Sequence, residues 1–298
     1  MNSSQAQPRN ERYIIGFWRR LIGNRSGFAG LIFILLVSLS ALAGPRIYRV
    51  SPIVTDFATI NAPPTLSHPL GTDRLGHDTL ARVLAGLRVS LLVAAVVEVI
   101  NILVGAVLGL LAGYFGGWVD TLISRLADLF FAFPGLLLAI LVAAIFGPWV
   151  TLHYGSLARL LLVAGSLSLI GWPLMARYVR GQVLSLRERD FILAARMIGC
   201  SQAGILQRHI LPNVIGLVIT AATLDVINAI VGEATLSLLG LGIQAPQTSI
   251  GKMIVEAAPF LAQNWFMTFV PSVALTLLVL SFSFLGDGLR DAFDPAGR

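Results

Sequence analysis

The sequence predicts an all-α, polytopic membrane protein with six transmembrane helices. Hydrophobic residues make up 56% of the 298 residues and charged residues only 12%, whereas soluble domains contain about 45–50% apolar and about 25% charged residues. Charge-poor runs recur along the chain, and each is close to the roughly 20 residues that a helix needs to cross the hydrocarbon core. This composition excludes a disordered chain and argues against a water-soluble globule.

The six predicted spans follow the charge-poor runs in order. They cover residues 27–45, 89–113, 129–147, 157–177, 213–235 and 265–286. In the third span a broken helix over 127–135 remains open as an alternative. In the second span Gly105, Gly109 and Gly113 recur every four residues. One face of that helix is therefore free of side chains, and we expect another helix to pack closely against it.

The distribution of Lys and Arg predicts that both termini are cytoplasmic. Fourteen of the 21 lie in the N-terminal tail, the segments after the second and fourth spans, and the C-terminus, and seven lie on the other side. Positive charges are enriched in cytoplasmic segments, so the side with fourteen is predicted to face the cytoplasm. The segment between the first two spans is an exception, because it places five arginines on the predicted outer side.

The chain divides into five consecutive parts. A cytoplasmic tail over 1–26 leads into the first transmembrane helix over 27–45. An extracytoplasmic segment over 46–87 follows, and its apolar residues from position 77 onwards fall on one helical face. That pattern predicts an interfacial helix, with a plain connector as the alternative. The main transmembrane domain covers 88–287, and a cytoplasmic tail covers 288–298.

The segment 178–212, between the fourth and fifth spans, carries turn signals at regular places. Asp190 can cap a short helix over 191–198, and Gly199 suits the left-handed position after that helix. Ser201 can cap a second short helix, and Pro212 suits the first turn of the next span. These signals predict a preorganised knob made of two short helices; a capped surface loop without a partner is the alternative.

The residues of this knob resemble the coupling loop of permeases in ATP-binding cassette (ABC) importers. That loop has a Glu-Ala-Ala triplet, a Gly three residues later and an apolar-Leu-Pro ending. Leu193 replaces the acidic residue of the triplet here. Further similarity to the dipeptide, oligopeptide and nickel permeases runs in order through about 65–295. The matching residues are His68–Asp73, Ala112–Gly117, Arg187–Phe191, Ala194-Ala195, Gly199, Arg208–Asn213 and Gly286–Ala292. The chain thus resembles the second, C-type permease subunit.

This resemblance implies a type I ABC importer permease fold in a bacterial inner membrane, with the transporter domain at 88–287. It implies a subunit that is not an enzyme and forms half of a pathway for peptides or a related small solute, such as a nickel chelate, glutathione or an opine. The implied partners are a second homologous permease, two cytoplasmic ABC ATPases that bind ATP and Mg²⁺, and an extracytoplasmic solute-binding protein. The implied coupling residues are Asp190, Ala194, Ala195, Arg196, Gly199, Ile210, Leu211 and Pro212.

Polar side chains within the spans are candidates for lining the translocation path. Ionisable groups are costly in a membrane unless they face protein or water. The candidates are Glu98 and Asn101 in the second span, and Asp225, Asn228 and Glu233 in the fifth. Interhelical hydrogen bonding is the alternative role for these residues.

Other chemistry has little support in the sequence. Gly251-Lys252 lacks the remainder of a P-loop, so we expect no ATP site in this chain. The four histidines and the single Cys200 show no metal-ligand spacing, so no metal or cofactor is expected. A stand-alone secondary transporter or channel would show inverted repeats, and an intramembrane hydrolase would need a histidine facing Ser166 or Ser168. The expected surroundings are a lipid bilayer. Arginines on a cytoplasmic face need no nucleic-acid partner to explain them.

Overall fold

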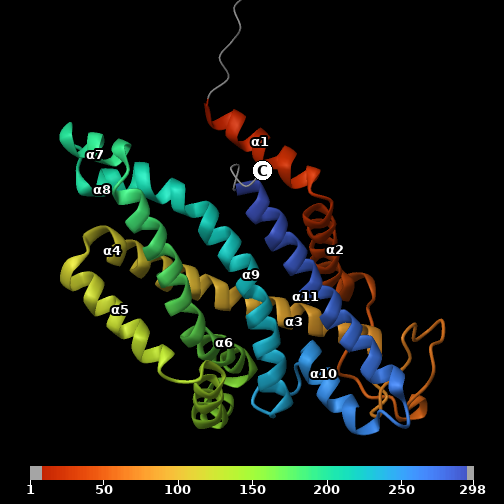
Figure 1. Cartoon of the computed structure of the whole chain (residues 1–298). Helices are drawn as coiled ribbons and strands as arrows, with labels where there is room; N and C mark the ends of the chain where they lie inside the picture. The colour runs from red at the N-terminus through yellow and green to blue at the C-terminus, as the bar shows by residue number, and fades with distance from the viewer. Residues whose placement is uncertain (1–8, 294–298) are drawn as a thin grey trace, which may run out of the picture.

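The computed structural model describes residues 9–293, and most of this part of the chain is helical (Figure 1). The helices are α1 (Arg9–Gly23), α2 (Arg25–Ile47), α3 (Thr79–Ile100), α4 (Val107–Phe115), α5 (Gly117–Phe131), α6 (Gly135–Arg187), α7 (Asp190–Met197), α8 (Gln202–Ile205), α9 (Leu211–Leu238), α10 (Ile250–Ala257) and α11 (Trp265–Phe293). Two π-helical stretches, Asn101–Ala106 and Leu206–Ile210, join α3 to α4 and α8 to α9. Two 3-10 turns cover Phe57–Thr59 and Ala258–Phe260.

Five continuous helical stretches within residues 9–293 are long and apolar enough to cross a membrane. They are Arg25–Ile47, Thr79–Phe115, Gly135–Arg187, Gln202–Leu238 and Trp265–Phe293. The third consists of two helices that meet at Gly155, whose φ of 75° and ψ of −166° are not helical. Glycine adopts a positive φ without a steric penalty, so the chain can turn there. The two limbs of α6 and the other four stretches follow the order of the six predicted spans and confirm an all-α membrane fold.

The predicted position of the third span is wrong. The sequence favours one helix over 129–147, but α5 ends at Phe131 and α6 begins at Gly135. Pro134 has no backbone N–H to donate and disfavours a helical conformation in the residue before it, so the helix breaks here. The broken helix that the sequence left open over 127–135 is the observed arrangement.

The second span begins earlier than predicted. α3 starts at Thr79, where the carboxylate of Asp78 accepts a hydrogen bond of 2.7 Å from the backbone N–H of Ala81. The segment from position 77 onwards, which the sequence predicts as an interfacial helix, therefore contains the first turns of α3. The helix continues without a break to Phe115. Several apolar side chains in these first turns are buried, so this part of α3 packs against protein.

The glycine face of the second span packs against the second limb of α6, as the spacing predicts. A Cβ atom on Gly105 would lie 2.5 Å from the carbonyl oxygen of Trp172, and one on Gly109 would lie 2.4 Å from that of Ala176. At Gly113 the nearest atom of the same limb would be 2.7 Å away. These separations are shorter than non-bonded contacts, so only glycine permits this close approach of two helices.

The two ends of the bundle carry different elements. Figure 1 shows α1, α7, α8 and the C-terminal end of α11 at the upper end, and α10 with the long segment after α2 at the lower end. This arrangement agrees with the predicted grouping of both tails and the knob on one side. At the upper end, Leu21 of α1 packs against Leu289 and Ala292 of α11.

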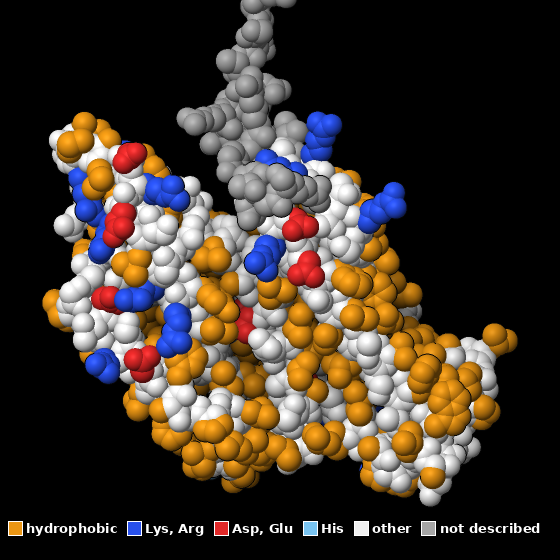
Figure 2. All heavy atoms as spheres, viewed as in Figure 1, with side chains coloured by type: hydrophobic (Ala, Val, Ile, Leu, Met, Phe, Trp, Pro, Cys, Tyr) orange, Lys and Arg blue, Asp and Glu red, His pale blue; other side chains and the backbone are white. Residues whose placement is uncertain are grey.

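Charged and hydrophobic side chains occupy different parts of the surface. Figure 2 shows Lys, Arg, Asp and Glu gathered towards the upper end, and hydrophobic side chains over much of the lower part. Along α2, the side chains of Leu35, Leu36, Leu39 and Leu42 are 56–63% exposed. Lipid tails are as apolar as leucine, so a bilayer accommodates such a surface.

Candidate functional site

α7 and α8 form the compact knob that the turn signals predict. Gly199 has a φ of +80° and lies just after Ile198, the residue that caps the C-terminal end of α7. Its N–H donates a hydrogen bond of 3.0 Å to the carbonyl oxygen of Arg196, and the N–H of Cys200 donates one of 3.1 Å to that of Ala195. These are the two bonds of a Schellman motif, which ends a helix with glycine in the left-handed conformation. The expected role of Gly199 as the stop of α7 is confirmed.

The two helices of the knob begin in different ways. The hydroxyl of Ser201 accepts a hydrogen bond of 3.1 Å from the N–H of Gly204 and caps α8 as predicted. The sequence predicts Asp190 as the cap of α7, but Asp190 is the first residue of the helix and Arg189 occupies the cap position. A negative charge in the first turn still interacts favourably with the helix dipole. Pro212 lies in the first turn of α9, as predicted.

Buried side chains fasten the knob to the ends of the long helices. Ile192 and Ala195 of α7 are at most 5% exposed, and so are Ile205 of α8 and Ile210 before α9. All four belong to one apolar cluster with Val183 of α6. This packed cluster joins the knob to the ends of α6 and α9.

The opposite face of the knob exposes apolar side chains. Met197 and Ile198 are 83% and 81% exposed, and Leu193 is 45% exposed. An exposed apolar group at the end where charged residues gather is typical of a surface that binds another protein. The predicted coupling residues are divided between the two faces. Asp190, Ala194, Arg196, Gly199, Leu211 and Pro212 are exposed, whereas Ala195 and Ile210 are buried.

Four of the five candidate path residues lie together between α3 and α9. The side-chain amide of Asn101 donates a hydrogen bond of 3.0 Å to Oδ2 of Asp225. The side-chain amide of Asn228 donates one of 2.9 Å to Oδ1 of the same carboxylate. Glu98 lies almost one helical turn before Asn101, and its carboxyl group is near enough to that of Asp225 for the two to repel each other when both are charged.

Glu233, the fifth candidate, is fully buried in a separate hydrogen-bonded group. Its carboxylate accepts hydrogen bonds of 2.7 Å from the hydroxyls of Ser237 and Ser249, and one of 3.4 Å from Ser90. These side chains come from α3, α9 and the residue that caps α10. The arrangement supports interhelical hydrogen bonding for Glu233, because its oxygens face hydroxyl donors of neighbouring segments.

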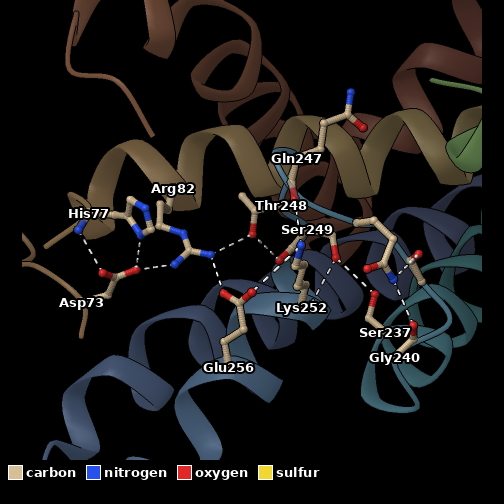
Figure 3. A network of polar contacts seen from close by, with 12 residues as sticks. Asp73, His77, Arg82, Ser237, Gly240, Gln247, Thr248, Ser249, Lys252 and Glu256 are labelled. Atoms are coloured by element: carbon tan, nitrogen blue, oxygen red, sulfur yellow. Dashed lines mark hydrogen bonds and ion pairs between the residues drawn. The ribbon is translucent and has the colours of Figure 1, made fainter. Parts of the chain in front are cut away.

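Another polar network lies at the end of the bundle opposite the knob (Figure 3). Nη2 of Arg82 lies 2.5 Å from Oε2 of Glu256, its Nη1 contacts Asp73, and Nδ1 of His77 lies 2.8 Å from Oδ2 of Asp73. The network joins the segment before α3 to α10. Burial alone would raise the pKa of the Asp73 carboxyl group, but hydrogen bonds from His77 and the charge of Arg82 hold that pKa below its ordinary value.

Several positive charges on the predicted outer side have partners within the chain. Arg82 pairs with two carboxylates, and the guanidinium of Arg74 lies 5.0 Å from the centre of the Phe260 ring. Nε of Arg159, a residue 4% exposed, donates a hydrogen bond of 3.1 Å to the carbonyl oxygen of Gly242. Sequence reasoning missed these contacts because most of the partners, Glu256, Phe260 and Gly242, are distant in the chain. They explain why arginines occur on this side: these three stabilise the fold.

The fold and the site together define a membrane transport component. An all-helical bundle with a lipid-compatible surface carries a rigid knob at one end and buried polar groups within its spans. Among the described residues, no group of three or more His, Cys, Asp or Glu side chains is arranged to hold a metal ion.

Family models identify the chain more closely. The model of the binding-protein-dependent transport system inner membrane component matches residues 105–298. The model of the N-terminal transmembrane domain of oligopeptide transport permease C matches residues 13–64. The chain belongs to this family of inner-membrane permeases of ABC importers, and such a permease is a membrane transport subunit.

Individual relatives match along almost the whole chain. The dipeptide transport system permease protein DppC of Bacillus subtilis is 37% identical over 94% of this chain and 85% of its own length. The oligopeptide transport system permease protein OppC of Mycobacterium bovis is 40% identical over 94% of each chain. A solved structure of the MetNI methionine ABC transporter has a TM-score of 0.54 at 20% identity, covering 70% of this chain and 94% of that chain. This last similarity shows that the fold is shared.

Proposed function

We propose that this permease moves peptides across the membrane as one half of a translocation pathway, with a second homologous permease as the other half. The relatives named for dipeptide and oligopeptide transport match 94% of the chain, which supports a peptide cargo. The observation that supports this proposal most directly is the structure of the knob. It exposes Met197 and Ile198 on one face and is fastened by Ile192 and Ile210 on the other.

The knob is suited to receive force from another protein. Two cytoplasmic ATPases would bind ATP and Mg²⁺, and one of them would hold the exposed face of α7. Ala194 presents a small side chain there, so the partner's surface could approach the helix backbone closely. When the ATPases close on ATP, the knob would move with its partner, and α6 and α9 would follow as rigid bodies. The pathway would then alternate between its outward-facing and inward-facing states.

The remaining assignments follow from the same proposal. The knob, the N-terminal tail and the C-terminal tail would face the cytoplasm, in agreement with the excess of Lys and Arg on that side. The end that carries α10 and the Arg82 network would face an extracytoplasmic solute-binding protein. That protein would deliver the peptide, and the chain itself would need no cofactor or metal.

Reconstitution tests the proposal directly. The chain would be coexpressed with its permease partner, its ATPases and its binding protein, and ATP-driven uptake of a labelled dipeptide would be measured in proteoliposomes. We expect uptake that requires ATP and the binding protein, and copurification of the ATPases with the chain. A Gly199→Asp variant should assemble but lose uptake, because it adds a charge and a side chain at a left-handed position of the docking surface. Normal uptake by this variant would contradict the coupling role.

A further inference from the structure

The cluster of Glu98, Asn101, Asp225 and Asn228 has more hydrogen-bond acceptors than donors. Asn101 and Asn228 are the side chains with N–H groups, and each donates to the carboxylate of Asp225. Both carboxylate oxygens of Glu98 and the side-chain oxygen of Asn101 are buried and have no hydrogen-bond partner among residues 9–293. Glu98 is 7% exposed and Asn101 is fully buried. Three buried acceptors therefore lack a donor, which is costly in a protein interior.

The position of the Asn101 side chain is determined by the fold. Asn101 is the first residue of the π-helical stretch between α3 and α4, and π-helical turns occur frequently at functional sites. Its amide fills the space above Gly171 of α6, where a Cβ atom would lie 2.1 Å from Nδ2 of Asn101. The amide is thereby held towards Asp225, and its oxygen remains without a donor.

The cluster reaches the surface of the chain on α9. Asn228 is exposed and Asp225 is partly exposed, while Glu98 is buried. A carboxylate facing lipid at this depth would be costly, so this surface fits a protein-lined or water-lined path better than the bilayer.

We propose that Glu98, Asn101 and Asp225 bind a positively charged nitrogen group of the transported solute. An ammonium group has three N–H donors and no acceptor, which matches the three unpartnered oxygens. Its charge also relieves the repulsion between the two carboxyl groups. This inference rests on the proposed function, and it adds the chemical class of the solute. The group is either the α-ammonium of a peptide or the ammonium of a lysine side chain.

Isosteric variants of the two acids in the complete transporter test the site. Glu98→Gln and Asp225→Asn would be compared with the wild type for uptake of alanyl-lysine and alanyl-glutamine, with the same binding protein throughout. We expect roughly tenfold slower uptake, the scale of a lost hydrogen bond to a charged group. If both peptides slow equally, the site holds the α-ammonium; if only alanyl-lysine slows, it holds the side chain. Asp225→Glu should retain much of the activity.

Control variants separate this effect from a loss of folding. Asp128→Asn makes the same chemical change at a carboxylate whose side chain is 55% exposed and should leave uptake unchanged. Assembly with the ATPases should be normal in the Glu98 and Asp225 variants. Unchanged uptake of both peptides by these variants would overturn the proposal. That result would show that a proton, bound between the carboxyl groups, already satisfies the cluster.

A binding measurement makes the test independent of peptide cargo. Ethylammonium chloride should raise the melting temperature of the assembled wild-type complex more than tetramethylammonium chloride, which has the same charge but no N–H donor. Asp225→Asn should lose this difference. An equal effect of the two salts, or a larger effect of sodium chloride, would overturn the proposal even if the variants failed to assemble. If the wild type failed to take up peptides but still showed the ethylammonium effect, the proposed peptide cargo would be wrong and the ammonium site would stand.

Discussion

Nε of Arg159 donates a hydrogen bond of 3.1 Å to the carbonyl oxygen of Gly242, and this contact joins the second limb of α6 to the segment after α9. The same guanidinium also donates to the carbonyl oxygens of Leu241 and Ala143. It lies against Gly147, where even a methyl side chain would overlap it. Within the described part of the chain, this buried arginine therefore has backbone carbonyl groups, and no carboxylate, as its hydrogen-bond partners.

Replacing Arg159 should weaken the packing of this end of the bundle. Arg159→Met keeps much of the side-chain volume but leaves buried carbonyl oxygens without a donor, which costs about 1–3 kcal/mol. Thermal melting of the purified permease complex should show a lower midpoint. Arg125→Met, at an exposed position of α5, serves as the matched control and should melt like the wild type. Equal melting of the two variants would show that the Arg159 contacts contribute nothing.

The close contact between the second span and α6 predicts that alanine substitutions at two glycines will change the stability of the protein very differently. Gly109→Ala places a methyl group 2.4 Å from the carbonyl oxygen of Ala176 and must force the helices apart; overpacking of this kind costs about 1–3 kcal/mol. Gly165→Ala, within α6, meets no atom within 4 Å. That change should be neutral or stabilise by up to about 1 kcal/mol, since alanine favours the helix. Melting and expression of the two variants would be compared; similar behaviour would refute the packing argument.

The exposed apolar face of the knob predicts a defect in coupling without a defect in folding. Met197 is 83% exposed, so Met197→Glu should melt like the wild type. A charge placed in an apolar docking surface should still reduce ATP-driven uptake by about tenfold or more, the scale of a central interface residue. Gln207→Glu adds the same charge at an exposed polar position of the π-helical stretch that follows α8 and is the control. Normal uptake by Met197→Glu would place the docking surface elsewhere.

The network around Asp73 predicts a stability that depends on pH. The pKa of Asp73 lies below its ordinary value because hydrogen bonds from His77 and the charge of Arg82 outweigh the effect of burial. The ionised group therefore contributes stability at pH values above the ordinary Asp pKa of about 3.9. That contribution is lost as the pH falls through the lowered pKa of the folded state. Asp73→Asn should melt at a lower temperature than the wild type near neutral pH.

The melting difference between wild type and Asp73→Asn should shrink on acidification. We expect it to decline below about pH 4, where the unfolded carboxyl group binds a proton. Asp56→Asn, at an exposed residue of the same segment, should show no comparable trend. A difference that stays constant with pH would mean that the Asp73 charge does not stabilise this end of the molecule.

Local signals in the sequence were sufficient for much of the fold and for the knob. Gly199 and Ser201 mark the turn between α7 and α8, because the left-handed conformation and the helix cap depend on single residues. The same locality explains two errors. Asp190 is a residue type that often caps helices, but it lies one position after the cap of α7. The apolar run over 129–147 is continuous in the sequence, although the helix breaks before Gly135.

The candidate path cluster was only half predictable. Helical spacing relates Glu98 to Asn101 and Asp225 to Asn228, since residues three apart lie on one face. Nothing in the spacing pairs Asn101 with Asp225, which are 124 positions apart. Glu233 looks the same as Asp225 in the sequence, yet three hydroxyl groups surround it in the folded chain.

The sequence by itself determined the membrane setting, the order of the spans and the knob, because hydropathy, helix period and turn chemistry act over a few neighbouring residues. Only the tertiary structure decided which polar groups become partners. Arg82 meets Glu256 and Arg159 meets Gly242 because helices from distant parts of the chain cross there. Whether a buried group is satisfied depends on these crossings, and for that reason the unpartnered oxygens of Glu98 and Asn101 become visible only in the folded chain.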